Sequence, residues 1–134
     1  MNLFELYNKE DESPSLMSAF QDFLPMVMDY LDIDLLPHIE LEKEISSDRP
    51  TFGCYVDEEN TIYIAITNRH PTDILRTLAH ELVHYKQDTK DEIEHDSGDT
   101  GSDEENEANA EAGIIMRNFN EKYPKYLNST PIVD

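Results

Sequence analysis

The stretch TIYIAITNRHPTDILRTLAHELVHYKQ, residues 61–87, joins an apolar segment to an amphipathic one through a short polar connection. Its first six residues are rich in β-branched and aromatic side chains, which favour a strand. Pro71 suits the first turn of a helix, and Asp73 complements the positive end of the helix dipole. Beyond them, apolar residues recur at helical spacing and form one stripe: Ile74, Leu75, Leu78, Ala79, Leu82 and Val83. The stretch therefore predicts a strand that leads directly into a helix with one buried face.

Further strands are expected upstream of this stretch. TFGCYV (residues 51–56) and TIYIAI (residues 61–66) flank DEEN, a polar connection of the length that closes a hairpin. HIELEKEI, residues 38–45, alternates apolar and charged side chains, which is typical of a half-exposed strand. We therefore expect a small antiparallel sheet of about three strands. TIYIAI is expected to lie at an edge, where strand addition could hold an extended peptide.

Two more helices are expected, one upstream of these strands and one downstream of HELVH. SPSLMSAFQDFLPMVMDYLDI, residues 13–33, carries apolar residues at spacings of three and four, and Pro25 is expected to kink or split that helix. Downstream, Ser102 and Glu105 match a capping box, in which each side chain satisfies a free backbone amide of the other. The helix that starts there should run to about Lys122. Together these elements predict an α+β fold.

Length and composition indicate how the chain is organised. Its 134 residues fit one domain, so residues 1–134 are expected to form a single unit. Residues 1–12 and 127–134 are expected to be flexible ends. The polar, glycine-containing stretch at residues 88–101 is expected to be a mobile loop.

The charge is strongly acidic, with 30 Asp and Glu against 10 Lys and Arg and a formal net charge of -20. Such a surface repels phosphate backbones and anionic membranes, so neither direct nucleic-acid binding nor membrane binding is expected. The lone Cys54 cannot form an internal disulfide, and the start of the sequence lacks a signal-peptide pattern. We therefore expect a cytoplasmic protein. Its acidity is either that of a solvated surface or that of a surface that attracts basic partners.

The residues best suited to chemistry lie in HELVH, residues 80–84. His80 and His84 are four residues apart on the predicted helix, so their imidazoles project from one face and can bind one metal ion. Glu81 lies beside that face, where its carboxylate can reach a water molecule at the metal. The alternative is a pair of surface histidines on a charged helix.

A catalytic zinc site normally has three protein ligands and one open position, so a third ligand is needed. On the downstream helix, Glu104, Glu107 and Glu111 lie on or beside an apolar face formed by Ala108, Ala112, Ile115 and Phe119. Carboxylates on such a face are costly unless they are paired or bind a metal. The alternative is a simply acidic helix whose glutamates reach water, and the spacing leaves all three glutamates open.

HELVH followed by the Glu107 of NEANAEA resembles the gluzincin pattern, in which a glutamate from a downstream helix completes a zinc site. EENEANAEA, residues 104–112, is also similar to the ExEAN segment of ImmA/IrrE-like peptidases. Short phage and bacterial proteins of SprT-like or ImmA-like type share the layout of a strand and a hairpin followed by two helices. The resemblance covers about residues 50–120.

The resemblance implies a zincin-like fold with one Zn²⁺ per chain, bound by His80, His84 and Glu107. It makes Glu81 the general base and acid, and it places Glu111 just behind the ligands. The sequence departs from the ImmA-like pattern in two ways: it has Glu111 where a hydrophobic residue is common, and it lacks the glycine of HELGH. Glu104 and Glu111 therefore stay open as alternatives to Glu107.

The implied activity is zinc-dependent hydrolysis of peptide or protein substrates, including basic ones, in the cytoplasm of a bacterial or phage-infected cell. A further side chain would stabilise the oxyanion, and the candidates are Tyr85, His95, Tyr123 and Tyr126. Each of the four is more often structural than catalytic. The alternative function is a non-catalytic acidic protein that sequesters a basic partner, either through the zincin fold or by imitating DNA.

Overall fold

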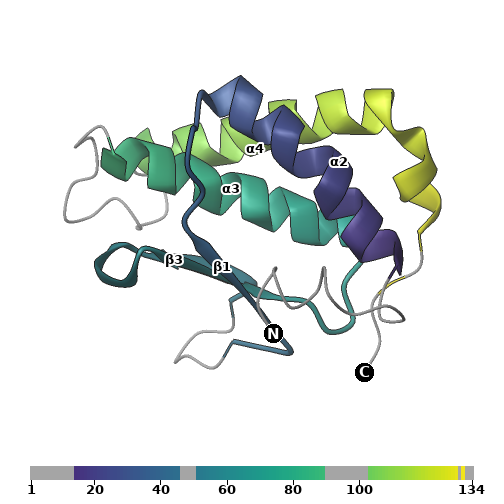
Figure 1. The fold of residues 1–134 in the computed structure, drawn as a ribbon, viewed down its shortest axis with the longest axis horizontal. Coiled ribbons are helices and arrows are strands. Elements are labelled where there is room, and N and C mark those ends of the chain that lie inside the picture. Colours follow the sequence, from purple (N-terminus) through teal and green to yellow (C-terminus); the bar gives the residue numbers. More distant parts are fainter. Residues whose placement is uncertain (1–13, 46–50, 90–102, 130, 132–134) are drawn as a thin grey trace.

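The computed structural model describes residues 14–45, 51–89, 103–129 and 131. Over these residues the chain is an α+β protein with three α-helices and a three-stranded sheet (Figure 1). The elements in chain order are α2 (Pro14–Leu31), β1 (His38–Glu42), β2 (Gly53–Val56), the short 3₁₀ helix η1 (Asp57–Glu59), β3 (Thr61–Ala65), α3 (Pro71–Thr89), α4 (Asp103–Lys122) and the 3₁₀ helix η2 (Pro124–Asn128).

The sheet is mixed, with the strand order β1-β3-β2. β2 and β3 form the predicted antiparallel hairpin, with η1 in its connection. β1 pairs with β3 in parallel, so the prediction of a wholly antiparallel sheet was wrong for this pair. The reason is the order of the strands in space. The hairpin places β3 between β1 and β2, and β3 then runs antiparallel to β2 and in the same direction as β1.

β3 is the central strand of the described sheet, and two of its apolar side chains are buried. Ile62 and Ile64 are fully buried under the helices, and they align with apolar residues of β1. Because β3 is bonded to a strand on each side, it cannot accept a further strand. The prediction that TIYIAI lies at an edge was therefore wrong, and the edges of the described sheet are β1 and β2.

The helices cover one face of the sheet, and α3 lies between the sheet and the other two helices (Figure 1). Its apolar stripe is buried as predicted, with Leu75, Leu78 and Leu82 fully inaccessible. On the outer side, Phe23 of α2 meets Phe119 of α4 edge to face, with ring centroids 5.4 Å apart. The histidine-bearing helix is thus packed on both sides.

Most predicted helix boundaries are confirmed. α3 begins at Pro71, and α4 runs from Asp103 to Lys122, while Ser102 lies outside the described residues. α2 is one continuous helix with Pro25 inside it, so the predicted split does not occur. Pro25 is exposed, as is Gln21, whose carbonyl loses its helical partner, so water can replace that hydrogen bond.

The expected mobile segments fall partly outside the described residues. Residues 88 and 89 form the end of α3, and residues 127 and 128 belong to η2. Residues 1–12, 90–101, 130 and 132–134 lie outside the described part of the chain.

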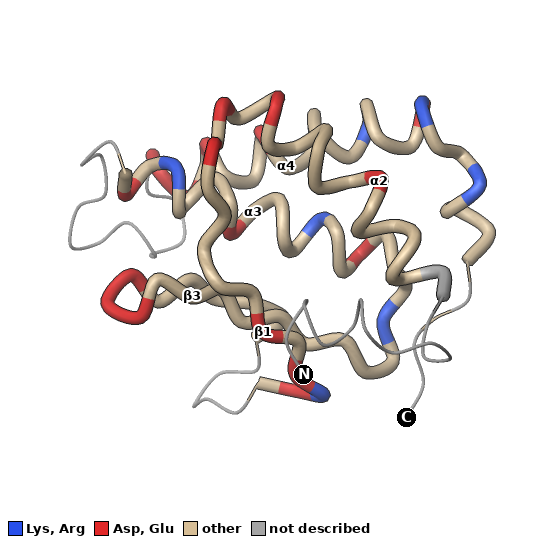
Figure 2. Tube along the Cα trace, viewed as in Figure 1, with Lys and Arg blue, Asp and Glu red and all other residues tan. Residues whose placement is uncertain are grey.

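Charge is distributed over several elements of the described chain (Figure 2). The three residues of η1, Asp57, Glu58 and Glu59, are all acidic and exposed. No helix in residues 14–31, 71–89 or 103–122 combines the length and the apolar character that crossing a bilayer requires.

Candidate metal centre

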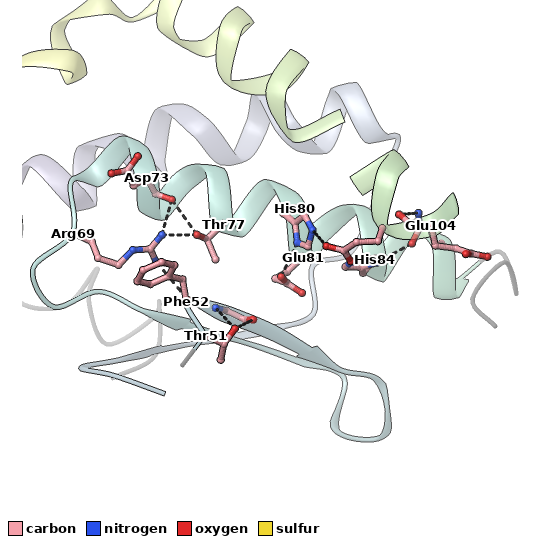
Figure 3. A network of polar contacts seen from close by, with 12 residues as sticks. Thr51, Phe52, Arg69, Asp73, Thr77, His80, Glu81, His84 and Glu104 are labelled. Atoms are coloured by element: carbon pink, nitrogen blue, oxygen red, sulfur yellow. Dashed lines mark hydrogen bonds and ion pairs between the residues drawn. The ribbon is translucent and has the colours of Figure 1, made fainter. Parts of the chain in front are cut away.

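Two histidines of α3 and one glutamate of α4 converge at one point. His80 Nε2 lies 2.7 Å from one carboxylate oxygen of Glu105, and His84 Nε2 lies 2.9 Å from the other. The three ligand atoms are within 4.8 Å of one another. Figure 3 shows His80, Glu81 and His84 on α3, beside the first turn of α4. These three groups could hold a metal ion.

Local sequence explains why the groups meet. The spacing of four residues places both imidazoles on one side of α3, and their ring centroids are 4.8 Å apart. On α4, Ala108 and Ala112 are buried, and their small side chains allow α4 to lie close along α3. Glu105 is three and seven residues before these alanines, so it shares their face and points toward α3.

The spacing of the ligand atoms is compatible with a bound ion. Tetrahedral zinc binds nitrogen and oxygen at ~2.0–2.1 Å, which separates neighbouring ligand atoms by ~3.3 Å. The observed separations of 2.7 and 2.9 Å are those of direct contacts, and small side-chain rotations would widen them. Imidazole nitrogen and carboxylate oxygen suit several divalent metals, so the ligand types do not by themselves identify the ion.

Hydrogen-bond accounting also favours a cation here. The Nδ1 atom of His80 contacts Glu81 at 2.8 Å, and that of His84 contacts Gln87 Oε1 at 2.9 Å. Every ring nitrogen of the two histidines therefore faces an acceptor, since both Nε2 atoms face Glu105. A neutral imidazole has only one N–H, so two neutral rings leave two of the four contacts without a proton. Two additional protons on the rings, or one divalent cation beside the Nε2 atoms, would make all four of these contacts favourable.

The surroundings are buried and acidic. Glu81 is 7% exposed and His84 is 9% exposed, so water screens electrostatic interactions at this point only weakly. Burial opposes a charge on His80, but hydrogen bonds to Glu81 and Glu105 and the charges of these carboxylates prevail and raise the pKa of His80. A proton on His80 is thus favoured at this point.

The glutamate that meets the histidines is Glu105, whereas the sequence had favoured Glu107 and kept Glu104 and Glu111 open. Glu107 is ~200° further round the helix, and its carboxylate accepts a hydrogen bond of 2.7 Å from Gln87. Glu111 accepts a hydrogen bond of 2.7 Å from Tyr30 of α2. The backbone carbonyl of Glu104 accepts one of 3.0 Å from Gln87.

Glu105 was missed because the capping-box motif assigned it to the helix start. A signal in the sequence could have found it: Glu105, Ala108, Ala112, Ile115 and Phe119 follow the spacing of a single buried face. A glutamate at the start of such a face is directed at the neighbouring helix.

The three tyrosine candidates for oxyanion stabiliser have other contacts in the structure. The hydroxyl of Tyr85 donates to the Leu35 carbonyl at 2.8 Å, and that of Tyr126 donates to Asp22 of α2. Tyr123 packs its ring on Phe119, with centroids 5.2 Å apart. His95 lies outside the described residues.

Strand β2 approaches α3 very closely beside Glu81, a feature that sequence patterns did not reveal. A Cβ atom at Gly53 would lie 3.5 Å from Cγ of Glu81 and only 2.4 Å from the Thr77 methyl. The buried Arg69 fixes this junction, since it donates to the Ala65 carbonyl at 2.7 Å. It also donates to Thr77 Oγ1 at 2.6 Å (Figure 3). Burial lowers the pKa of the Arg69 guanidinium.

Comparison of the chain with protein-family models, with curated proteins and with solved structures finds no match. The fold and the site together describe an α+β protein with a candidate metal-binding group, formed by His80, His84 and Glu105.

Proposed function

We propose that this protein is a zinc-dependent metallopeptidase, with His80, His84 and Glu105 as the zinc ligands and Glu81 as the general base. The observation that carries the proposal is the convergence of both Nε2 atoms on one carboxylate from a second helix, beside a buried glutamate. The order of residues in HELVH supports it, because this order places a base next to a metal-activated water. Two histidines and one carboxylate also match the ligand set of known catalytic zinc sites.

The chemistry divides between the ion and the protein. Zinc bound at such a site polarises the substrate carbonyl and lowers the pKa of water toward ~7. Glu81 would take the proton of the attacking water and pass it to the leaving amine. In the structure its carboxylate contacts His80 Nδ1, so catalysis requires that Glu81 rotate from this contact toward the substrate side.

The strand beside Glu81 suggests how a substrate would lie. β2 is an edge of the described sheet, and its first residue, Gly53, lies close to Glu81. An extended peptide that paired with β2 would place its backbone next to the general base. This assigns to β2 the role that the sequence had suggested for TIYIAI.

The test is zinc content and zinc affinity of the purified protein, measured beside three matched glutamate-to-glutamine variants. We expect about one zinc per chain in the wild type, loss of zinc in Glu105→Gln, and near-normal zinc in Glu107→Gln. Glu81→Gln should keep zinc but lose hydrolysis of a peptide library by about 10²–10⁴-fold. Absence of zinc from the wild type under metal-replete conditions would refute the proposal, as would full zinc occupancy in Glu105→Gln.

The net charge of -20 favours a second candidate, a non-catalytic acidic protein that binds a basic partner. In that case Glu81→Gln would leave function intact. Neutralising the exposed acids of η1, Asp57, Glu58 and Glu59, would weaken partner binding instead.

A further inference from the structure

Gln87 is a buried polar side chain next to the candidate metal centre, and only 2% of it is exposed. Its Oε1 atom lies 2.9 Å from His84 Nδ1. Its Nε2 atom lies 3.0 Å from the backbone carbonyl of Glu104 and 2.7 Å from the carboxylate of Glu107. One amide group therefore connects a candidate ligand on α3 with the first turns of α4.

These partners fix which way the amide points. The carbonyl oxygen of Glu104 can only accept a hydrogen bond, so the NH₂ group of Gln87 must face α4. The amide oxygen then faces His84, and an oxygen there can only accept. Nδ1 of His84 must therefore carry a proton.

A proton on Nδ1 has a direct consequence for the other ring nitrogen. When the imidazole is neutral, its lone pair lies on Nε2, the atom that faces Glu105. We propose that Gln87 is a positioning residue, which orients the His84 ring and keeps its proton on Nδ1 so that Nε2 is presented to the metal. This inference rests on the proposed metal centre.

The same side chain also positions the third ligand. Gln87 bonds the carbonyl of Glu104, the residue directly before Glu105, so it ties the backbone that carries Glu105 to α3. Partners behind the ligands commonly change metal affinity by about 10–100-fold when they are removed. Gln87 acts on two of the three ligands, and we therefore expect an effect in this range.

The chemistry of an amide is required at this position. Leucine has a similar size, but it would leave both His84 Nδ1–H and the Glu104 carbonyl without a partner. Glutamate could accept from Nδ1, but it would place a second carboxylate against Glu107. That repulsion is relieved in the exchanged pair Gln87→Glu/Glu107→Gln, where the amide at position 107 can donate to the new carboxylate.

Zinc affinity is measured by competition with a chromophoric chelator in the wild type, Gln87→Leu, Gln87→Glu and the exchanged pair. Ile115→Val is the control, because it removes a buried methylene from α4 without touching the network. We expect affinity to fall about 10–100-fold in Gln87→Leu and Gln87→Glu, to recover partly in the exchanged pair, and to stay unchanged in the control.

The second readout is histidine ¹⁵N NMR of the zinc-free proteins. Nδ1 of His84 should be protonated in the wild type, and in Gln87→Leu the proton should move to Nε2, where Glu105 is the remaining acceptor. If Gln87→Leu binds zinc as tightly as the wild type, or its Nδ1 signal does not change, the inference is refuted. If the wild type binds no zinc, the metal centre fails instead, and the NMR comparison still tests the Gln87 contact.

Discussion

Replacing Gly53 with alanine should destabilise the protein through one defined clash. The new Cβ would lie 2.4 Å from the Thr77 methyl, whereas non-bonded carbon atoms prefer ~3.5–4.0 Å. Thr77 cannot simply rotate away, because its hydroxyl accepts from Arg69 at 2.6 Å and donates to the Asp73 carbonyl at 3.1 Å. Either β2 must move away from α3, or the hydrogen bonds of Thr77 must break.

Overpacking of this kind costs about 1–3 kcal/mol. For a chain of this size, 1 kcal/mol corresponds to a change in Tm of about 3–5 °C, so Gly53→Ala should lower Tm by about 3–15 °C. Gly113→Ala is a matched control, because nothing apart from the adjoining backbone of its own helix lies within 4 Å of its new Cβ. Within helix α4 that change should stabilise the protein by about 0.5–1 kcal/mol.

The assay is thermal and urea unfolding of both glycine variants, of Thr77→Ser, and of the double variant Gly53→Ala/Thr77→Ser. Serine removes the clashing methyl but keeps the hydroxyl that Arg69 requires. Alanine at position 53 should therefore cost much less in the Thr77→Ser background than in the wild type. Equal costs in the two backgrounds would show that the close approach of β2 to α3 is not limited by this contact.

Two further predictions concern ligand binding and pH. Zinc at about 1,000 times its Kd should raise the free energy of unfolding by ~4 kcal/mol; a chelator should reverse the gain, Glu105→Gln should abolish it, and Glu107→Gln should retain it. Burial, the hydrogen bond to Asp22 and the charge of Asp22 raise the pKa of Tyr126, so the folded state holds this proton more tightly than the unfolded state. The stabilisation is complete below the unfolded pKa of ~10 and is lost as the pH rises above it. Tyr126→Phe should lower the free energy of unfolding by about 1–2 kcal/mol at pH 7. Urea titrations at several pH values should show that this difference from the wild type shrinks above pH 10. A difference that does not change with pH would contradict the prediction.

Local features of the fold were predictable because they depend on neighbouring residues. Pro71 and Asp73 marked the start of α3, and the polar DEEN segment marked the hairpin. The parallel pairing of β1 with β3 was not predictable in this way. It depends on which strand takes the central place, and no short stretch of sequence encodes that choice.

At the candidate site, too, the features set by neighbouring residues were predictable and those set by the packing of helices were not. His80 and His84 were recognisable because both lie on one helix, so their relative position follows from helix geometry alone. The third group depends on how α4 is rotated against α3, and one residue of helix corresponds to a rotation of ~100°. Glutamates occur at four positions from 104 to 111, so only the packing of Ala108 and Ala112 selects Glu105.

The described contacts give the two sides of α3 different tasks at the candidate site. On the sheet side, Gly53 and Arg69 bring β2 against the helix next to Glu81, which is the residue proposed to act on substrate. On the α4 side, Gln87 and Glu105 engage the histidines, which are proposed to bind the ion. Because the two sets of contacts use different partners, substitutions on the α4 side should act first on metal affinity. Substitutions on the sheet side should act on the position of the base and the strand beside it, and HELVH joins the two in one turn of helix.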